Sequence, residues 1–340
     1  MLGQGQILAA LNQTVSALEV RPYHPEAFLL LAEICRDAGD FKRAFEFANH
    51  ARRIAPGWTA AQQFLKSPKS EGDAKIELPP RVDSLLSQDT PRLTVCLITK
   101  NEERFLGRCL ESIRDVAQQI IVVDTGSTDA TREIAAQAGA EVYSFVWCDD
   151  FSAARNAGLE RATGDWILVL DADEELLEGQ REKFLRLLQD SAAIAFRLPL
   201  IDEGHEAEGV NYVPRLFRNA PGVYYAGYVH EHVFLSVDSL RQKWGLDNKL
   251  GDATLLHHGY TTEMRQSRGK GARNVRLLRK ALEETPEDPN LVMNLGLELV
   301  RSGDLSEGIK QYDAAFRIVS ALPSDQISPE FRETLLTQFC

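Results

Sequence analysis

The chain has 340 residues, which is long enough for two or three domains with separate hydrophobic cores. Its 44% hydrophobic and 26% charged residues are typical of globular proteins, and no apolar run approaches the roughly 18 residues of a membrane-spanning helix. The formal net charge of -12 argues against binding to nucleic acid, and the N-terminus lacks the basic segment and cleavage site of a signal peptide.

Residues 1–65 carry the pattern of paired amphipathic helices. In residues 25–56, apolar or small side chains recur at helical spacing on both sides of Gly39, and Pro56 ends the pattern. Residues 289–320 repeat this frame far downstream. Both segments resemble tetratricopeptide repeats.

Residues 66–91 mix Pro, Ser, Gly and charged residues, which is the composition of a linker. After them come short apolar runs of strand-like length, at residues 92–99, 119–124, 140–145 and 165–171. Helical patterns separate these runs, at residues 102–117, 128–138 and 151–162. Strands that alternate with helices predict an open, mostly parallel sheet, which binds ligands at the carboxyl ends of its strands.

Acidic residues follow the fourth apolar run. Asp171 and Asp173 alternate along an extended segment, so both carboxylates can point to one side. Two hard oxygen ligands suit Mg²⁺ or Mn²⁺, which take their other ligands from water and phosphate. The alternative is a solvated loop. We expect the next two acids, Glu174 and Glu175, to begin a helix, where the helix dipole favours them.

Asp124 ends the second apolar run and precedes a tight turn at Gly126 and Ser127. A carboxylate at this position can accept hydrogen bonds from a base or a ribose. Ser127 and Thr128 can instead cap the following helix, which is the structural alternative for this turn. No GxGxxG pattern follows the first strand, so a dinucleotide site is not predicted.

Three stretches in this order, "VCLITKNEE", "VVDTGSTD" and "DDFSAARNAGLERATGDWILVLDADEE", resemble the nucleotide-binding half of inverting family 2 glycosyltransferases with a GT-A fold. The later "RLFRNAPGVYYAGYVHEHV" and "HHGY" resemble a bacterial branch of that family that often carries tetratricopeptide repeats. The resemblance implies an α/β GT-A core flanked by helical repeats. The expected organisation is a repeat at 1–65, a linker at 66–91, the GT-A domain at 92–262 and further repeats at 263–340.

The resemblance also implies roles for single residues. Those assigned to the nucleotide sugar are Thr99, Asn101, Glu102, Asp124, Ser127, Arg155 and Asp171. For Arg155 the alternative is an arginine on a helix surface. Asp173 is the first choice as metal ligand, with Asp171 beside it and His258, or alternatively His257, as a third. The histidines lack HExxH or nearby Cys spacing, so a zinc site is not favoured over a structural role.

Glycosyl transfer with inversion requires a base that takes the proton of the acceptor. Glu231 lies between two histidines in an otherwise apolar and aromatic stretch, where burial would raise its pKa towards a useful range. We expect Glu231 to be this base, with Glu174 and Asp202 as alternatives. A divalent cation would stabilise the negative charge of the diphosphate leaving group.

The helical pattern returns in residues 263–340. Residues 274–286 fit the closing helix of another repeat, and the last stretch begins a new helix, so we expect a chain truncated from a longer protein. Because one repeat cannot bury its apolar face alone, the repeats should pack on each other, on the central domain or on a partner protein. Between Met264 and Lys280 there are seven basic residues and no acid, which either meet the diphosphate or form a solvated helix face.

The sequence therefore predicts a metal-dependent inverting glycosyltransferase. The expected donor is a UDP-sugar, and the acceptor is a hydroxyl or thiol on a glycan, a lipid-linked saccharide or a protein. The alternative is a tetratricopeptide scaffold with a non-catalytic nucleotide-sugar domain. A sugar nucleotidyltransferase would need a Gly-rich basic loop after the first strand, which "TKNEERF" lacks. Five scattered cysteines, three in apolar surroundings, favour the cytoplasm.

Overall fold

The computed structural model describes residues 4–67, 75–79, 82, 86, 90–204, 209–258, 270–323, 331 and 335–337. The chain divides into two compact units. Unit 1 comprises Met1–Val146, Ala154–Tyr224 and Val233–His258, and unit 2 comprises Trp147–Ala153, Tyr225–His232 and Gly259–Cys340. Within the described part of the chain, no helix is both long enough and apolar enough to cross a membrane.

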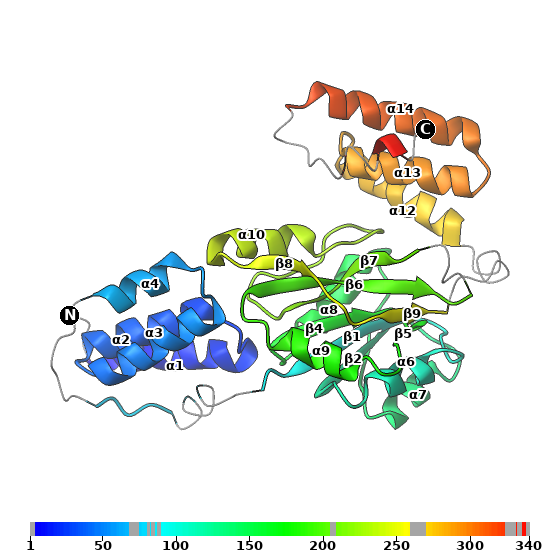
Figure 1. The fold of residues 1–340 in the computed structure, drawn as a ribbon. Coiled ribbons are helices and arrows are strands. Elements are labelled where there is room, and N and C mark those ends of the chain that lie inside the picture. The colour runs from blue at the N-terminus through cyan, green and yellow to red at the C-terminus, as the bar shows by residue number, and fades with distance from the viewer. Residues whose placement is uncertain are drawn as a thin grey trace. The chain divides into compact units, whose positions relative to one another are not determined.

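Unit 1 begins with four helices, drawn in blue in Figure 1: α1 (Gln4–Val20), α2 (Pro25–Asp37), α3 (Phe41–Ile54) and α4 (Thr59–Lys66). The turn between α2 and α3 contains Gly39 at a φ of 88°, a left-handed conformation that suits glycine. Asp40 then caps α3 by accepting a hydrogen bond from the Arg43 amide at 3.1 Å. The helix pair predicted around Gly39 is confirmed.

The rest of unit 1 is built on one nine-stranded sheet. The strands β1 (Leu93–Thr99), β2 (Gln119–Asp124), β3 (Glu141–Ser144) and β4 (Trp166–Leu170) are parallel, in the order β3-β2-β1-β4. The sheet continues from β4 through antiparallel β7 (Asn211–Arg218), then β6 (Ala193–Asp202), β9 (Leu255–His257) and β5 (Glu174–Leu176), and β8 (Asp247–Leu250) pairs with β6. The expected mostly parallel α/β core flanked by helices is confirmed.

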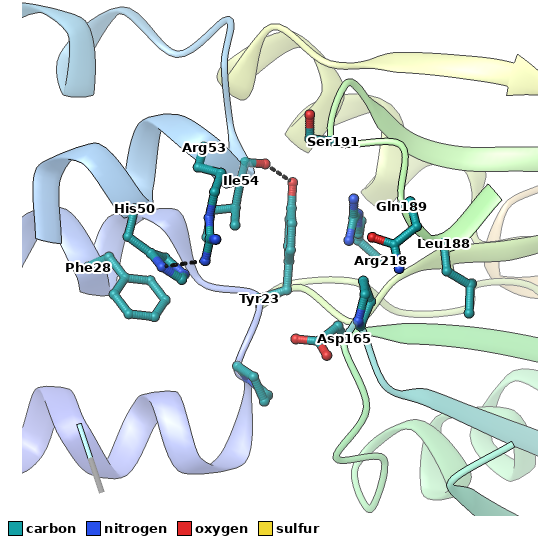
Figure 2. A pocket seen from close by; sticks show the side chains of 12 residues that line it. Tyr23, Phe28, His50, Arg53, Ile54, Asp165, Leu188, Gln189, Ser191 and Arg218 are labelled. Atoms are coloured by element: carbon teal, nitrogen blue, oxygen red, sulfur yellow. Dashed lines mark hydrogen bonds between the residues drawn. The ribbon is translucent and has the colours of Figure 1, made fainter. Parts of the chain in front are cut away.

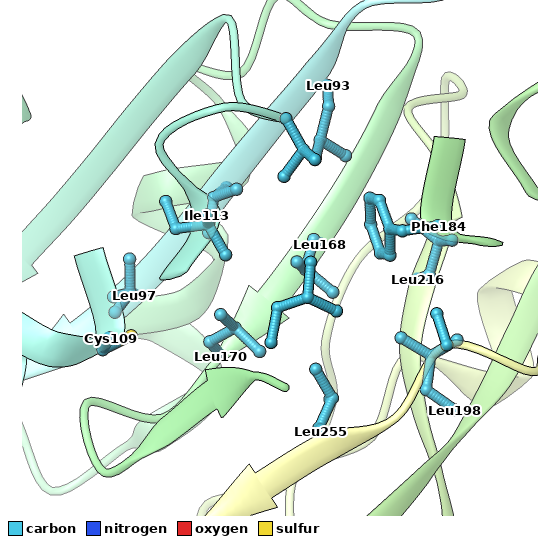
Figure 3. Packing of buried hydrophobic residues seen from close by; sticks show 14 of the residues in the cluster. Leu93, Leu97, Cys109, Ile113, Leu168, Leu170, Phe184, Leu198, Leu216 and Leu255 are labelled. Carbon is cyan, nitrogen blue, oxygen red and sulfur yellow. The ribbon is translucent and has the colours of Figure 1, made fainter. Parts of the chain in front are cut away.

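The helices of the sheet region are α6 (Leu106–Ile113), α7 (Thr131–Gln137), α8 (Phe151–Leu159), α9 (Arg181–Leu188) and α10 (Phe234–Trp244). Side chains of β1 and β4 pack with those of α6 and α9 in the main core, and Figure 3 shows Leu97, Ile113, Leu168 and Phe184 among them. Both faces of β4 are buried, which explains its unbroken apolar run.

One local expectation and one alternative were wrong. Glu174 and Glu175 do not start a helix but lie in the short strand β5, which pairs with β9. Ser127 and Thr128 do not cap the next helix, because α7 begins later, at Thr131. The Thr131 amide instead donates to the Asp129 carboxylate at 3.1 Å.

Within unit 1, the N-terminal helices pack on the sheet region. The Arg218 guanidinium lies over the rings of Tyr23 and Trp166, 4.5 and 3.8 Å from their centroids. Gly57 and Gly245 meet backbone to backbone, since a Cβ on Gly57 would stand 2.2 Å from the Gly245 oxygen. Tyr23 and Arg218 also line a pocket of about 160 Å³, which Figure 2 shows. The expectation that a repeat would pack on the central domain is met here.

Unit 2 contains α12 (Lys270–Glu284), α13 (Pro289–Arg301) and α14 (Leu305–Ala321). The last two form the second predicted helix pair, with Gly303 at a φ of 94° in the turn. Gly296 and Gly308 allow the helices to cross closely, because a Cβ on Gly308 would stand 2.9 Å from the Gly296 oxygen. Most of the linker at 66–91 and of the final predicted helix lies outside the described residues.

Candidate functional site

The ends of β1 and β2 lie side by side, because Thr99 pairs with Asp124 in the parallel register. Asp124 is 1% exposed, and its carboxylate accepts hydrogen bonds from the amides of Gly126 at 3.2 Å and Ser127 at 3.1 Å. The Arg132 guanidinium stands 3.6 Å away. Asp124 therefore stabilises the turn that follows β2, which is the turn predicted to contact the nucleotide.

Hydrogen bonds join the loop after β1 to the loop after β2. The Asn101 amide donates to the Ser127 hydroxyl at 2.9 Å, and the Asn101 side-chain oxygen accepts from the Thr128 amide at 2.8 Å. The Glu102 amide donates to the Thr131 hydroxyl at 2.7 Å. Asn101 has a φ of 56°, a strained conformation of the kind found at binding sites. The structure thus brings the predicted residues of these two loops together.

Asp171 follows β4 and is held by two arginines. Arg155 on α8 donates to its Oδ1 at 2.9 Å, and Arg215 on β7 donates to its Oδ2 at 2.7 Å. Burial opposes ionisation of Asp171, but Arg215 and then Arg155 outweigh it and hold the pKa of this carboxyl below its usual range. Arg155 is 8% exposed, which excludes the alternative of a helix-surface arginine.

Glu174 completes this ionic cluster. Its side chain is bonded to Arg215, and its Oε2 accepts a hydrogen bond from the Asp171 amide at 3.1 Å. Burial raises the pKa of Glu174; Arg215 lowers it, and the neighbouring Asp171 raises it further. Arg215 therefore braces both ends of the turn that contains Asp173. Arg215 was not among the predicted site residues, although it lies in the "RLFRN" run on a strand whose next residues are buried.

Asp173 is 8% exposed and lies beside a histidine of β9. The His257 Nε2 stands 3.6 Å from the Asp173 Oδ2, and the His257 Nδ1 is 2.7 Å from the Asp202 Oδ1. Burial lowers the pKa of His257, but hydrogen bonds with Asp173 and Asp202 outweigh it and raise the pKa to about 9. His257 can hold a cation at its Nε2 only as the neutral imidazole, so metal binding there would displace a proton.

The structure places His257, and not the predicted His258, next to the Asp173 carboxylate. His258 is 5% exposed, with its Nδ1 2.8 Å from the Glu203 Oε2 and its Nε2 3.1 Å from the Glu175 Oε1. Its backbone amide donates to the Asp173 carbonyl at 2.8 Å. Among the described residues, no group of three or more His, Cys, Asp and Glu side chains is arranged to hold a metal ion.

Glu231, the predicted base, belongs to unit 2. It lies in a loop closed by the backbone pairing of Ala226 with His232. The loop contains Gly227 at a φ of 105° and His230 at a φ of 54°, so two of its residues are left-handed.

The residues at the ends of β1, β2 and β4 fall within a stretch that matches a known family. Residues 94–219 match the model described as glycosyl transferase family 2, and residues 2–57 match that of the tetratricopeptide repeat. Residues 94–219 belong to glycosyl transferase family 2. This family 2 domain includes Asp124, Asp171, Asp173 and Arg215, while His257 lies beyond the match. The predicted family is confirmed.

Two similar proteins are named for one or the other of these features. A TPR repeat-containing protein of Synechococcus elongatus is 39% identical over 232 residues, which are 65% of this chain and 57% of that protein. The glycosyltransferase SunS of Bacillus subtilis, described as SPbeta prophage-derived, is 32% identical over 218 residues, 62% of this chain and 50% of the relative. The matches thus span about half the length of these relatives.

Similar solved structures include S. aureus TarS 1-349 in complex with UDP-GlcNAc, at a TM-score of 0.47 and 15% identity, covering 68% of this chain and 82% of that one. Another is glucosyl-3-phosphoglycerate synthase from Mycobacterium tuberculosis, in complex with Mn²⁺ and UDP-Glc, at a TM-score of 0.40 and 16% identity. It covers 56% of this chain and 79% of the synthase.

Proposed function

We propose that this chain transfers a sugar from a UDP-sugar to an acceptor hydroxyl or thiol, with inversion and with a divalent cation. One observation carries the proposal: the strand ends of the family 2 domain gather Asp124, Asp171 and Asp173 with the buried Arg155 and the mostly buried Arg215. Such an array of fixed charges suits a nucleoside diphosphate. The name of SunS as a glycosyltransferase supports the same reading.

The donor nucleoside would contact the turns after β1 and β2. Asn101 and Ser127 lie there on loops that are already hydrogen-bonded to each other, so the pocket edge requires little reordering on binding. Asp124 would receive the base or ribose. Arg155 and Arg215 would keep Asp171 ionised and supply positive charge near the diphosphate.

The side chains beside Asp173 fit a divalent cation. The Nε2 of His257 faces the Asp173 carboxylate, while its Nδ1 is bonded to Asp202, the second partner that orients a metal-binding imidazole. Asp173 and His257 would hold the cation, whose charge would stabilise the diphosphate that leaves. Since both oxygens of Asp171 are engaged by arginines, we assign Asp171 to the arginines rather than to the metal.

In the transfer step, the acceptor oxygen or sulfur forms a bond to the anomeric carbon while the bond from that carbon to the diphosphate oxygen breaks. The electron pair of the broken bond leaves with the diphosphate, and Glu231 takes the proton of the acceptor. The alternative bases, Glu174 and Asp202, are paired with Arg215 and with His257.

Isothermal calorimetry of UDP against the full chain tests the proposal. We expect binding in Mn²⁺ that weakens at least about tenfold in EDTA and in Asp173→Asn. Glu231→Gln should bind UDP as the wild type does but lose turnover of the UDP-sugar. Absence of UDP binding would refute the proposed donor, and equal binding with and without Mn²⁺ would refute the role of the cation. Binding without turnover for every UDP-sugar would favour the non-catalytic alternative.

A further inference from the structure

Two short segments of the sheet region belong to the same compact unit as the C-terminal helices. These are Trp147–Ala153 and Tyr225–His232, and the second contains Glu231. The segments are hydrogen-bonded to each other: the Phe151 amide donates to the Tyr228 carbonyl at 3.0 Å, and the Ser152 hydroxyl donates to the Gly227 carbonyl. They form one surface that the C-terminal helices cover.

An apolar cluster joins the Glu231 loop to α12 and α13. Val229, two residues before Glu231, is 6% exposed. It packs with four leucines of the two helices: Leu277, Leu278, Leu295 and Leu299. Trp147 and Phe151 of the first segment pack against the same cluster. The helix face that a repeat could offer to a partner protein is therefore covered by the chain itself.

Basic residues of α12 make the polar part of this contact. Arg276 donates to both carboxylate oxygens of Asp149, at 2.7 and 2.8 Å. The Arg273 guanidinium lies 4.9 Å from the Phe151 ring centroid, and the Lys280 ammonium lies 5.2 Å from that of Tyr228. These are three of the seven basic residues predicted to meet a diphosphate or solvent. Arg276 and Lys280 are exposed, in keeping with a solvated helix face, and all three also make contacts within unit 2.

The residue next to Glu231 has a left-handed backbone, and its side chain contacts α13. His230 has a φ of 54°, which is uncommon for a residue with a Cβ. Its Nε2 stands 3.6 Å from the Oε1 of Glu298, a carboxylate that is only 5% exposed. Glu298 also accepts a hydrogen bond from Asn274 at 3.3 Å. A left-handed conformation of this kind depends on support from its surroundings, and the contact between His230 and Glu298 can supply that support.

Arg273 connects Glu298 with Glu231 electrostatically. Burial lowers the pKa of Arg273, and the charges of Glu298 and Glu231 oppose this shift. Both carboxylates are therefore close enough to interact with one guanidinium. A change at Glu298 should reach Glu231 by two routes, through the His230 backbone and through Arg273.

We propose that Glu298 is a positioning residue that holds the 225–232 loop in shape, and that α12 and α13 serve the transfer reaction by orienting Glu231. The role of α12 and α13 in the transfer reaction rests on the proposed function. The C-terminal helices are then a part of the enzyme, and the face that contacts the loop is not a docking site for another protein.

Hydrogen exchange of the full chain, followed by mass spectrometry, tests the first half. Glu298→Leu should raise exchange in peptides covering 225–232 at least about tenfold, while Glu298→Gln, which keeps an acceptor oxygen, should raise it much less. Glu307→Leu on α14 is the control, because the hydrogen bonds of the Glu307 carboxylate go to Lys310 and Gln311 of the same helix. Unchanged exchange at 225–232 in Glu298→Leu would overturn the proposal. So would an equal rise across 289–301, since that would mean α13 itself had unfolded.

A strain test follows from the same geometry. Asparagine tolerates the left-handed region better than histidine does. His230→Asn added to Glu298→Leu should therefore restore part of the lost protection, and a further loss would refute the role assigned to the strain.

The second half is tested with UDP-sugar hydrolysis, in which water replaces the unidentified acceptor. Glu298→Leu should lower kcat at least about tenfold and leave KM for the donor within about twofold. Raised exchange with wild-type kcat would refute the orientation of Glu231. If the wild-type chain neither binds UDP nor hydrolyses a UDP-sugar, the proposed function fails, while the exchange result still decides the role of Glu298 in the loop.

Discussion

Replacing Arg218 by methionine should uncouple the N-terminal helices from the sheet region of unit 1. The side chain is 6% exposed and lies over the rings of Tyr23 and Trp166. Its Nε and Nη2 donate to the carbonyls of Ala193 at 3.3 Å and Asp190 at 2.8 Å. Methionine retains an unbranched apolar stem in this space but removes the donors and the charge.

The magnitude follows from these contacts. Two hydrogen bonds from a charged donor contribute about 1.5 kcal/mol each, and two cation–π contacts contribute about 0.5–1 kcal/mol each, for a gross loss of about 4–5 kcal/mol. The variant no longer bears the desolvation cost of a buried guanidinium, which offsets part of that loss. We therefore expect the free energy of unfolding to fall by about 2–3 kcal/mol.

Urea unfolding followed by tryptophan fluorescence measures this loss, because Trp166 and Trp244 are buried in unit 1. A double-mutant cycle with Tyr23→Leu isolates the contact between the repeat and the arginine, and we expect a coupling of about 1 kcal/mol. Arg197→Met on the neighbouring strand β6, where the arginine is exposed, is the control and should change stability by less than about 0.5 kcal/mol. A coupling of zero would show that Arg218 does not fasten the repeat to the sheet.

Three other substitutions test separate parts of the structure. Arg215→Gln should weaken UDP binding at least about tenfold, because Asp171 and Glu174 lose their shared partner, and Arg215→Lys should restore part of the affinity. Wild-type affinity for both variants in calorimetry would contradict this role of Arg215. Burial, aided by Arg53, lowers the pKa of His50 to about 4. Between about pH 6.5 and 4 the unfolded chain therefore binds one more proton than the folded chain, and the free energy of unfolding falls as the pH drops. In urea titrations, His50→Phe should reduce this pH dependence by up to about 1.4 kcal/mol per pH unit, and an unchanged pH dependence would exclude His50 as its source. Gly57→Ala would place a Cβ 2.2 Å from the Gly245 oxygen and should lower the melting temperature by several degrees. An unchanged melting temperature would contradict this close backbone contact.

Much of the fold could be predicted because its signals are local. The strands β1, β2 and β4 are continuous apolar runs, and α2, α3, α13 and α14 carry a helical period with glycine at each turn. The antiparallel half of the sheet gave weaker signals. β5 has three residues and begins with two acids, which is why the sequence pattern favoured a helix start at Glu174 and Glu175. The strand is recognisable only from its pairing with β9.

The residues of the candidate site also differ in how well the sequence predicts them. Asp124, Asp171 and Asp173 could be predicted, because parallel strands bring their carboxyl ends to one edge of the sheet. Arg215 was not predicted, since it comes from β7, whose neighbours in the sheet are distant in sequence. The choice between His257 and His258 stayed open for the same reason, because β9 lies between β6 and β5.

The sequence by itself determined the family 2 domain, the helical repeats beside it and the three aspartates, because these depend on short-range pattern and spacing. Only the tertiary structure decided which charges pair: Asp171 with two arginines, Asp173 beside His257, and Arg276 with Asp149. Pairing depends on the distance between side chains that the folded sheet and helices bring together, and that distance is not encoded in any local run of residues. The same long-range packing set the loop of Glu231 against the C-terminal helices.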